Sequence, residues 1–247
     1  GLAMGIVRRS DKNTKFAHST GYTLVYIFLF LLVIQGFLLQ GFRLAFDGNA
    51  PDKTWAFFGT LFSFLYPKDM NPQTANQIYT GLWYFHMLTT MGFIASLPYT
   101  RAMHIVTSIL NLYTLRLEPT VMLAKMNFED EHAEYFGARS ITDFSWKDLL
   151  SFDSCTECRR CTDICPANAV GKPLDPREVI LKMRDSMLVE SQFPKNGNKE
   201  TTYFYENEKI THDEIWACTN CGGCVNECPV GIDQLRAIMQ LKRYQTL

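Results

Sequence analysis

The sequence predicts a mainly α-helical protein in which a membrane-embedded N-terminal part precedes a small helical domain rich in cysteine. Two observations lead to this fold class. The long uncharged apolar runs all lie before residue 116, and the eight cysteines all lie between Cys155 and Cys228. A chain of 247 residues is long enough for two modest domains. We therefore expect a membrane domain at 1–116, a connector at 117–150 and a cysteine domain at 151–247.

Two runs in the N-terminal part are expected to cross the membrane. The first, 17–42, carries no formal charge, shows no polar stripe and exceeds the roughly 20 apolar residues that span a bilayer. The second, 71–100, has its apolar core at 79–97, and Pro98 is expected to kink the helix there. The short aromatic segment 55–66 lies between them and is expected at the membrane interface, which favours aromatic side chains.

The basic residues orient these two spans, because cytoplasmic flanks carry an excess of Lys and Arg. Such residues precede the first span and end the second: Arg8, Arg9, Lys12, Lys15, Arg101 and Arg116. In the loop between the spans, aspartates offset the basic residues. We therefore expect a multi-pass protein of the cytoplasmic (inner) membrane. Its cysteine domain would face the cytoplasm, a reducing compartment that suits free thiols.

The cysteines form two copies of the motif C-x2-C-x2-C-x3-C-P, at 155–166 and 218–229. In bacterial ferredoxins three closely spaced thiolates of this motif hold one [4Fe–4S] cluster, and the fourth ligates the other cluster. Zinc sites instead pair two short knuckles. The first cluster is thus assigned Cys155, Cys158, Cys161 and Cys228. The second cluster is assigned Cys218, Cys221, Cys224 and Cys165.

The two motifs differ at one pair of positions. Gly222 and Gly223 in the second motif allow the backbone to approach the cluster closely. Arg159 and Arg160 stand there in the first motif, and their positive charge is expected to raise the potential of that cluster.

Helix-start signals flank these motifs. Pro176 fits the first turn of a helix, where its missing N–H costs nothing. The segment 211–214 begins with Thr and ends with Glu, the pattern of a capping box. We therefore expect short helices in the cysteine domain.

Three histidines fall in or beside the spans, where an ionisable residue suggests a functional site: His18, His86 and His104. In antiparallel spans His18 and His104 lie at one level, where two imidazoles on facing helices can axially ligate a b-type haem. His86 lies about five turns from His104, on the same face of a continuous helix. A second haem at His86 would need a ligand from elsewhere, since 28–35 contains no histidine. The alternative is that these histidines form hydrogen bonds or contact a quinone.

Five segments carry a family resemblance: 36–43, 83–86, 97–111, 172–176 and 215–221. They resemble the membrane Fe–S oxidoreductases related to heterodisulfide reductase, and within these the electron-transfer-flavoprotein:quinone oxidoreductase group. The membrane part is similar to the gamma subunit of respiratory nitrate reductase. The resemblance implies haem b, a quinone site near the membrane interface and a helical ferredoxin-like domain. Arg43, Trp83 and Arg101 are then candidates for contacts with haem propionates or quinone.

This sequence departs from the family pattern in two ways. Family members usually have more spans than the two expected here. They also often continue into cysteine-rich CCG domains, and this sequence ends at Leu247 without one. The substrate chemistry of such domains is therefore expected on another polypeptide.

We expect a membrane-bound subunit that relays electrons between a cytoplasmic redox partner and the quinone pool through two [4Fe–4S] clusters and one haem b, or two. Its partners would be membrane lipid, quinone and a soluble redox partner or a CCG-type or flavoprotein subunit, within a hetero-oligomeric complex. A net charge of −1 gives no sign of nucleic-acid binding, and the sequence has no Ser/His/Asp set, phosphate loop or nucleotide fingerprint. Two alternatives stay open: a haem-free membrane anchor that carries a ferredoxin domain, and a fragment of a complete heterodisulfide-reductase-like enzyme.

Overall fold

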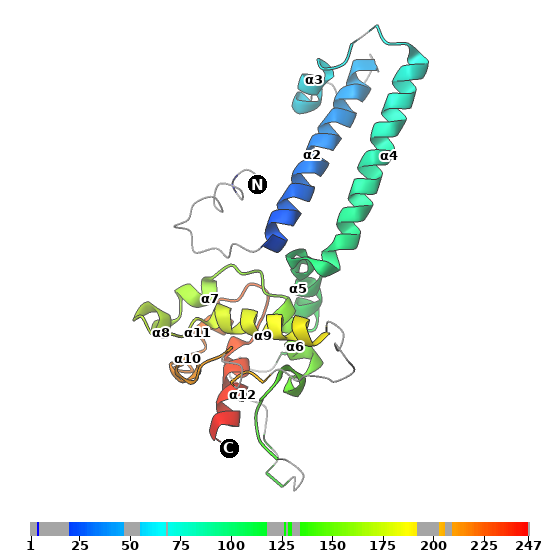
Figure 1. The fold of residues 1–247 in the computed structure, drawn as a ribbon. Helices are drawn as coiled ribbons and strands as arrows, with labels where there is room; N and C mark the ends of the chain where they lie inside the picture. Colours follow the sequence, from blue (N-terminus) through cyan, green and yellow to red (C-terminus); the bar gives the residue numbers. More distant parts are fainter. Residues whose placement is uncertain are drawn as a thin grey trace. The chain divides into compact units, whose positions relative to one another are not determined.

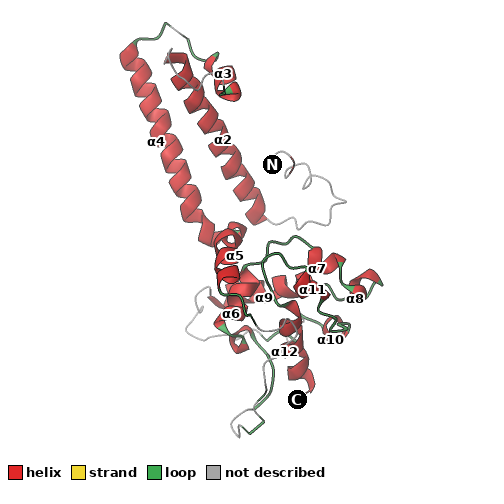
Figure 2. Ribbon diagram, turned by 180° about the vertical axis from the view of Figure 1, so that it is seen from behind, coloured by secondary structure: helices red, strands yellow, loops and turns green. Residues whose placement is uncertain are grey.

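The computed structural model describes residues 4, 20–46, 55–67, 69–117, 126, 128–129, 134–191, 203–205 and 209–246. Within these ranges the chain is helical, without a β-strand, and one isolated antiparallel bridge joins Ser140 to Tyr203 (Figure 2). The chain divides into two compact units, Gly1–Ala102 and Met103–Leu247. The mainly helical fold class is therefore confirmed for the described residues, whereas the domain boundaries expected near 116 and 150 stay predictions.

The N-terminal unit is a helical hairpin with a short third helix. Helices α2 (Thr20–Phe46) and α4 (Pro72–Ser96) run antiparallel and pack against each other (Figure 1). Helix α3 (Phe57–Ser63) packs on the C-terminal part of α2, where the rings of Phe37 and Phe58 have centroids 5.2 Å apart. A Cβ on Gly41 would lie 2.7 Å from the Cβ of Phe62. Glycine therefore allows α3 to approach α2 closely.

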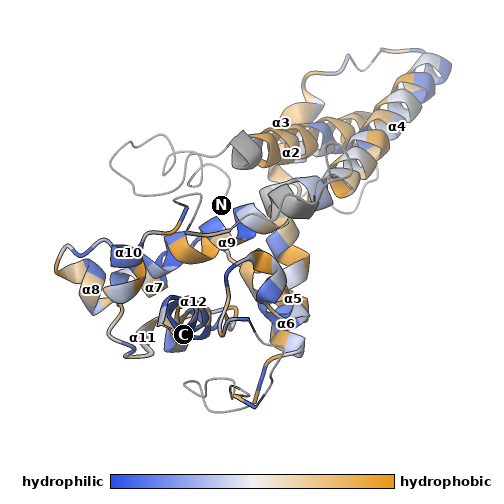
Figure 3. Cartoon of the chain, turned by 60° about the horizontal axis from the view of Figure 1, so that its bottom comes forward, coloured by the Kyte–Doolittle hydropathy of each residue, from blue (hydrophilic) through white to orange (hydrophobic). Residues whose placement is uncertain are grey.

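One of the two expected spans meets the length and apolarity needed to cross a bilayer. Among the residues that the structure describes, that segment is Leu24–Phe46, and Figure 3 shows hydrophobic residues along most of α2. Helix α4 is long enough, but its first turns contain Gln73, Asn76 and Gln77. Membrane association is thus supported by α2, while passage of α4 through the membrane stays a prediction.

The second long helix is interrupted. Helix α4 ends at Ser96 and is followed by two 3-10 turns, η1 (Leu97–Tyr99) and η2 (Arg101–Met103), before α5 (His104–Tyr113) begins. Pro98 lies in the first of these turns, after the end of α4, so its ring does not have to fit inside an α-helix. The expected kink is therefore a break, and the alignment of His86 with His104 on one continuous helix is wrong.

The C-terminal unit consists of short helices around a central one, α9 (Pro176–Ser191). The other elements are α5, η3 (Ile141–Asp143), α6 (Trp146–Asp153), α7 (Arg160–Asp163), α8 (Pro166–Ala169), α10 (His212–Trp216), α11 (Gly223–Asn226) and α12 (Gln234–Thr246). Helices α6, α7 and α12 pack against α9. Between them lies a hydrophobic core that includes Phe152, Met183, Phe204 and Leu241, each at most 1% exposed. This core holds the loops that carry the cysteines.

Both helix-start signals are found where the sequence places them. Helix α9 begins at Pro176, and the Asp175 carboxylate accepts hydrogen bonds from two N–H groups of its first turn at 2.9 and 3.4 Å. Thr211 caps α10 by accepting a hydrogen bond from the N–H of Glu214 at 3.3 Å. The Glu214 carboxylate pairs with Lys182 at 2.6 Å instead of closing the capping box. The Thr211 half of the expected capping box is thus present, while the Glu214 side chain makes a tertiary ion pair.

Candidate functional site

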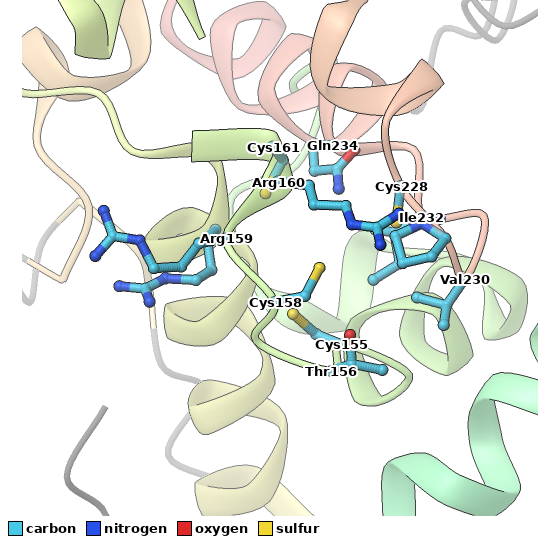
Figure 4. A pocket seen from close by; sticks show the side chains of 12 residues that line it. Cys155, Thr156, Cys158, Arg159, Arg160, Cys161, Cys228, Val230, Ile232 and Gln234 are labelled. Atoms are coloured by element: carbon cyan, nitrogen blue, oxygen red, sulfur yellow. Dashed lines mark hydrogen bonds between the residues drawn. The ribbon is translucent and has the colours of Figure 1, made fainter. Parts of the chain in front are cut away.

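The first cysteine motif folds around a pocket in the C-terminal unit. Four cysteines line this pocket, three from the motif and one from the end of the other motif: Cys155, Cys158, Cys161 and Cys228 (Figure 4). The backbone is left-handed at Glu157 and Arg159, with φ angles of 57° and 68°. These two residues turn the chain sharply, so that closely spaced cysteines can line one pocket.

The fourth cysteine of each motif lies beside the other motif. Cys228 is close enough to Cys155 and Cys161 for its charge to act on the pKa of both thiols. Cys165 acts in the same way on Cys218 and Cys224. The fold therefore gathers two mixed sets of thiols from cysteines that are distant in sequence.

These thiols lie in a poor environment for negative charge. Burial and, to a smaller extent, negative neighbours such as the other thiols together raise the pKa of Cys155, Cys161 and Cys224 to about 12 each. Without a cluster they are therefore protonated at neutral pH. Several thiolates can coexist here only when bound iron compensates their charge, which is the condition that an iron–sulfur cluster meets.

Backbone N–H groups complete the surroundings of the sulfurs. The N–H of Ile232 donates a hydrogen bond to Cys228 Sγ at 3.3 Å. Backbone hydrogen bonds at Glu157 and Asn220 oppose the rise in the pKa of Cys155 and Cys218. In the described part of the chain no three His, Cys, Asp or Glu side chains gather closely enough for a single metal ion. A four-iron cubane binds four thiolates, and the four cysteines that line one pocket provide such a donor set.

One candidate histidine has a defined partner within the hairpin. The Nδ1 atom of His86 lies 3.3 Å from Oε1 of Gln35, on the facing helix α2. Because Gln35 donates through Nε2 to Thr89 Oγ1 at 3.3 Å, its oxygen faces His86, and Nδ1 of the imidazole is the donor. The Nε2 atom of His86 then carries the lone pair that a metal can accept. His18 lies outside the described residues, so its pairing with His104 stays a prediction.

His104 is the first residue of α5 and is half-buried in the C-terminal unit. Helix α5 is attached to the cysteine loops on both sides of the pocket. Thr107 donates to the carbonyl of Asp153, two residues before Cys155, at 3.2 Å. Asn111 donates to the carbonyl of Val230 at 2.7 Å, just past the other motif. The helix that carries His104 is thus part of the cysteine-bearing unit.

The three weaker candidates lie in different elements of the N-terminal unit. Arg43 lies in the last turn of α2, and Trp83 lies in α4 with its ring edge-on to Tyr84. Arg101 belongs to the turn η2. A role for them at haem or quinone stays a prediction.

Several polar residues around the cysteines and histidines were not found from sequence: Gln35, Asn111, Lys147, Arg184 and Lys242. Gln35 stood out only as a polar residue inside an apolar run. The other four are buried, with at most 7% of their surface exposed, yet in sequence they look like ordinary surface residues. Their contacts join residues far apart in the chain, so no local pattern announces them.

The comparisons with known proteins agree with this donor set. Residues 154–232 match the model of the 4Fe-4S dicluster domain, a range that contains all eight cysteines. The C-terminal unit therefore contains a dicluster domain, which supports two [4Fe–4S] clusters. No solved structure matches the chain.

Three relatives place this domain among iron–sulfur proteins. The chain is 31% identical to the EtfAB:quinone oxidoreductase of Syntrophomonas wolfei over 98% of its own length and 38% of the relative. It is 32% identical to a probable membrane-anchored ferredoxin of Chromohalobacter salexigens, over 51% of the chain and 21% of the relative. It is 33% identical to a subunit of the dihydromethanophenazine:CoB–CoM heterodisulfide reductase of Methanosarcina mazei, over 34% of the chain and 22% of the relative.

The chain is thus related to iron–sulfur oxidoreductases that work in electron transfer, and it spans between 21% and 38% of the length of these relatives. A membrane-anchored ferredoxin among them agrees with the apolar helix α2. None of the three is a nitrate reductase gamma subunit, so that resemblance of the membrane part stays a prediction.

Proposed function

We propose that this chain is a membrane-bound electron-transfer subunit that relays electrons between a cytoplasmic redox partner and the quinone pool through two [4Fe–4S] clusters and haem b. The observation that carries the proposal is a dicluster domain in the same chain as the apolar helix segment Leu24–Phe46. Bound clusters supply one-electron chemistry, and the protein supplies ligands, burial and spacing.

The ligands of the clusters follow from the motif and the thiol neighbourhoods. We assign the first cluster to Cys155, Cys158, Cys161 and Cys228, which line one pocket. We assign the second cluster to Cys218, Cys221, Cys224 and Cys165. The proximity of Cys228 to Cys155, and of Cys165 to Cys218, supports this crosswise arrangement. It also ties the two motifs into one domain.

Haem b is assigned to the histidines of the N-terminal half and of α5. His18 and His104 are the proposed axial pair, and His86 is the proposed ligand of a second haem. The hydrogen bond from His86 to Gln35 supports a ligand role, because metal-ligating histidines usually donate their other N–H to a fixed acceptor. A quinone near the membrane interface, with Arg43, Trp83 and Arg101 as candidate contacts, completes the relay.

The partners and location of the chain follow from the same proposal. The names of two relatives mention a quinone oxidoreductase acting with EtfAB and a heterodisulfide reductase made of several subunits. We therefore infer a hetero-oligomeric complex with a soluble flavoprotein or CCG-type subunit. We also propose that the cysteine-bearing unit lies on the cytoplasmic side of the inner membrane, a location supported by the basic flanks of the expected spans.

A haem-free membrane anchor is the second candidate. A probable membrane-anchored ferredoxin is among the relatives, and the contacts of Thr107 and Asn111 bind the His104 helix to the cysteine-bearing unit. In that function α2 only anchors the ferredoxin domain. The chain also spans 38% of the quinone oxidoreductase relative, so a piece of a longer reductase is the third interpretation.

An optical spectrum of the purified full chain, recorded before and after reduction with dithionite, separates these functions. Iron and sulfide are measured first, so that the preparation is known to contain both clusters. Sharp reduced haem b bands are expected for the relay. Their absence from protein with fully loaded clusters would refute the relay and favour the anchor. The intact mass of the native polypeptide and of its co-purifying subunits tests whether it belongs to a longer enzyme.

Single histidine variants test the haem ligands. His104→Ala is expected to abolish the reduced haem bands of the proposed axial pair while iron and sulfide stay unchanged. His86→Ala is expected to remove a second haem only, if two are bound. The matched control is His212→Ala, since His212 is exposed on α10. Haem bands that survive His104→Ala would show that the ligand assignment is wrong.

A further inference from the structure

The two cysteine motifs form loops of the same conformation. In each loop the residue before the second cysteine is left-handed, at Glu157 with φ 57° and at Asn220 with φ 58°. The residue after the second cysteine is left-handed as well, at Arg159 with φ 68° and at Gly222 with φ 75°. Equivalent positions of the two loops can therefore be compared directly.

Each loop is held by one buried basic side chain from a later helix. Arg184 of α9 donates to the carbonyl of Cys155 at 3.4 Å and to the Glu157 carboxylate at 2.8 Å. Arg184 is 3% exposed.

The second loop has the same arrangement with different residues. Lys242 of α12 donates to the carbonyl of Cys218 at 2.8 Å and to Asn220 Oδ1 at 3.2 Å. Lys242 is 7% exposed, and its ammonium lies 5.3 Å from the centre of the Trp216 ring, a cation–π contact. A cation thus holds the first cysteine of both motifs.

The charge balance at the two loops differs by one unit. Arg184 is paired with a carboxylate that is itself 6% exposed, so the charges of this pair cancel. Lys242 meets a neutral amide at the equivalent position and keeps its positive charge. Both charge patterns lie next to a proposed cluster ligand, because each cation also donates to the backbone carbonyl of the first cysteine of its motif.

A reduced cluster carries one more negative charge than an oxidised one, so an uncompensated buried cation favours the reduced form. We propose that the residue facing each buried cation, Glu157 or Asn220, sets the two clusters apart in reduction potential, with the cluster held by the second motif the higher. This inference rests on the proposed presence of two clusters. Electrons that enter the pair would therefore come to rest on the second cluster.

The positive charges of Arg159 and Arg160 in the first motif oppose this order of reduction potentials, but their effect is weaker. Figure 4 shows the Arg159 side chain pointing away from the thiols and Arg160 reaching towards Cys228 and Ile232. Arg160 is exposed, so solvent and salt screen its charge, whereas the buried cations are screened much less. The expectation that these arginines raise the first cluster is thus outweighed by the buried charges.

The test is a redox titration of the full chain, in which reduction of the clusters is followed by electron paramagnetic resonance. Asn220→Asp adds a carboxylate to Lys242 with almost no change in size, and Glu157 shows that an acidic residue is accepted at this φ. The variant is expected to lower the equilibrium constant for reduction of the higher-potential cluster about tenfold and to leave the other cluster unchanged. A tenfold change corresponds to a fall of about 59 mV in the reduction potential of a one-electron couple. Glu157→Gln is expected to raise the lower-potential cluster by a similar factor.

Asn226→Asp is the matched control for the added charge. It places a carboxylate at an exposed position of the same motif and is expected to leave both potentials nearly unchanged. The proposal is overturned if Asn220→Asp shifts the reduction potential of the lower-potential cluster or of neither cluster. It is also overturned if Asn226→Asp causes an equal shift. A further contradicting result is a larger fall in the reduction potential of the first cluster in Arg160→Gln than in that of the second cluster in Asn220→Asp. Protein without iron and sulfide would instead refute the proposed function itself.

Discussion

Asn111 is a small side chain on which a buried polar network depends. It is fully buried at 0% exposure in α5. Its amide nitrogen donates to the carbonyl of Val230 at 2.7 Å. Its amide oxygen accepts hydrogen bonds from Lys147 Nζ and from Ser151 Oγ, the latter at 2.9 Å. Because Val230 follows the second motif closely, we expect Asn111→Ala to loosen the attachment of α5 to the cysteine loops.

The size of the effect follows from the partners left behind. The carbonyl of Val230 would stay buried without its donor, which costs about 1–3 kcal/mol. Lys147 would lose one acceptor of a charge-assisted bond, for about 1.5–3 kcal/mol, but it keeps the backbone carbonyl of Asn111 at 2.9 Å. A total of about 3–5 kcal/mol corresponds to a fall of about 10 °C in the unfolding midpoint for a unit of this size.

The assay is anaerobic heating of the detergent-solubilised full chain, with loss of cluster absorbance as the signal. Asn111→Asp keeps an acceptor for Lys147 but cannot donate to Val230, so its midpoint should fall between the wild type and Asn111→Ala. The exposed Asn226→Ala is the matched control and should stay within about 1 °C of the wild type. A midpoint of Asn111→Ala equal to that of the wild type, or no advantage of the aspartate, would refute this account of the network.

Two further predictions concern backbone positions in the same unit. Gly137→Ala is expected to lower the unfolding midpoint by about 5–10 °C, since φ is +96° and a Cβ there would clash with the carbonyl oxygen of Gln240. Gly171→Ala has φ +78° and open space around it, so it has the backbone strain without a steric clash. The difference between the two falls in unfolding midpoint therefore measures the clash, and equal falls would contradict the predicted clash. Thr211→Ala removes the cap of α10 and should cost about 1 kcal/mol, with Thr211→Ser restoring most of the loss. A serine variant no more stable than the alanine one would rule out the capping role.

Much of the cysteine site could be predicted from sequence because cluster ligation depends on the spacing of cysteines that are close together in the chain. The motif C-x2-C-x2-C-x3-C-P predicts cluster binding, and the match to the dicluster domain supports two clusters as cofactors. Local helix signals were also reliable at Pro176 and Thr211. Mean apolarity identified α2 as long and apolar enough to cross a membrane.

The helix around Pro98 shows the limit of the same reasoning. An uncharged run with a proline near its end predicts a kinked helix, but the chain breaks into two 3-10 turns between Ser96 and His104. A proline frees backbone groups of its helix, and whether the helix bends or ends depends on how those groups are satisfied. Composition does not contain that information, so the expectation of one continuous helix through His86 and His104 failed.

The sequence by itself determined that eight cysteines in two ferredoxin motifs follow an apolar, helical N-terminal part, because ligand spacing and hydrophobic run length are properties of the linear chain. Only the tertiary structure decided which side chains surround those cysteines and histidines. It placed Gln35 against His86 and set the buried cations Arg184 and Lys242 against Glu157 and Asn220. These contacts join residues brought together by packing of the hydrophobic core, and their charge and hydrogen-bond balance exists only once that core has formed.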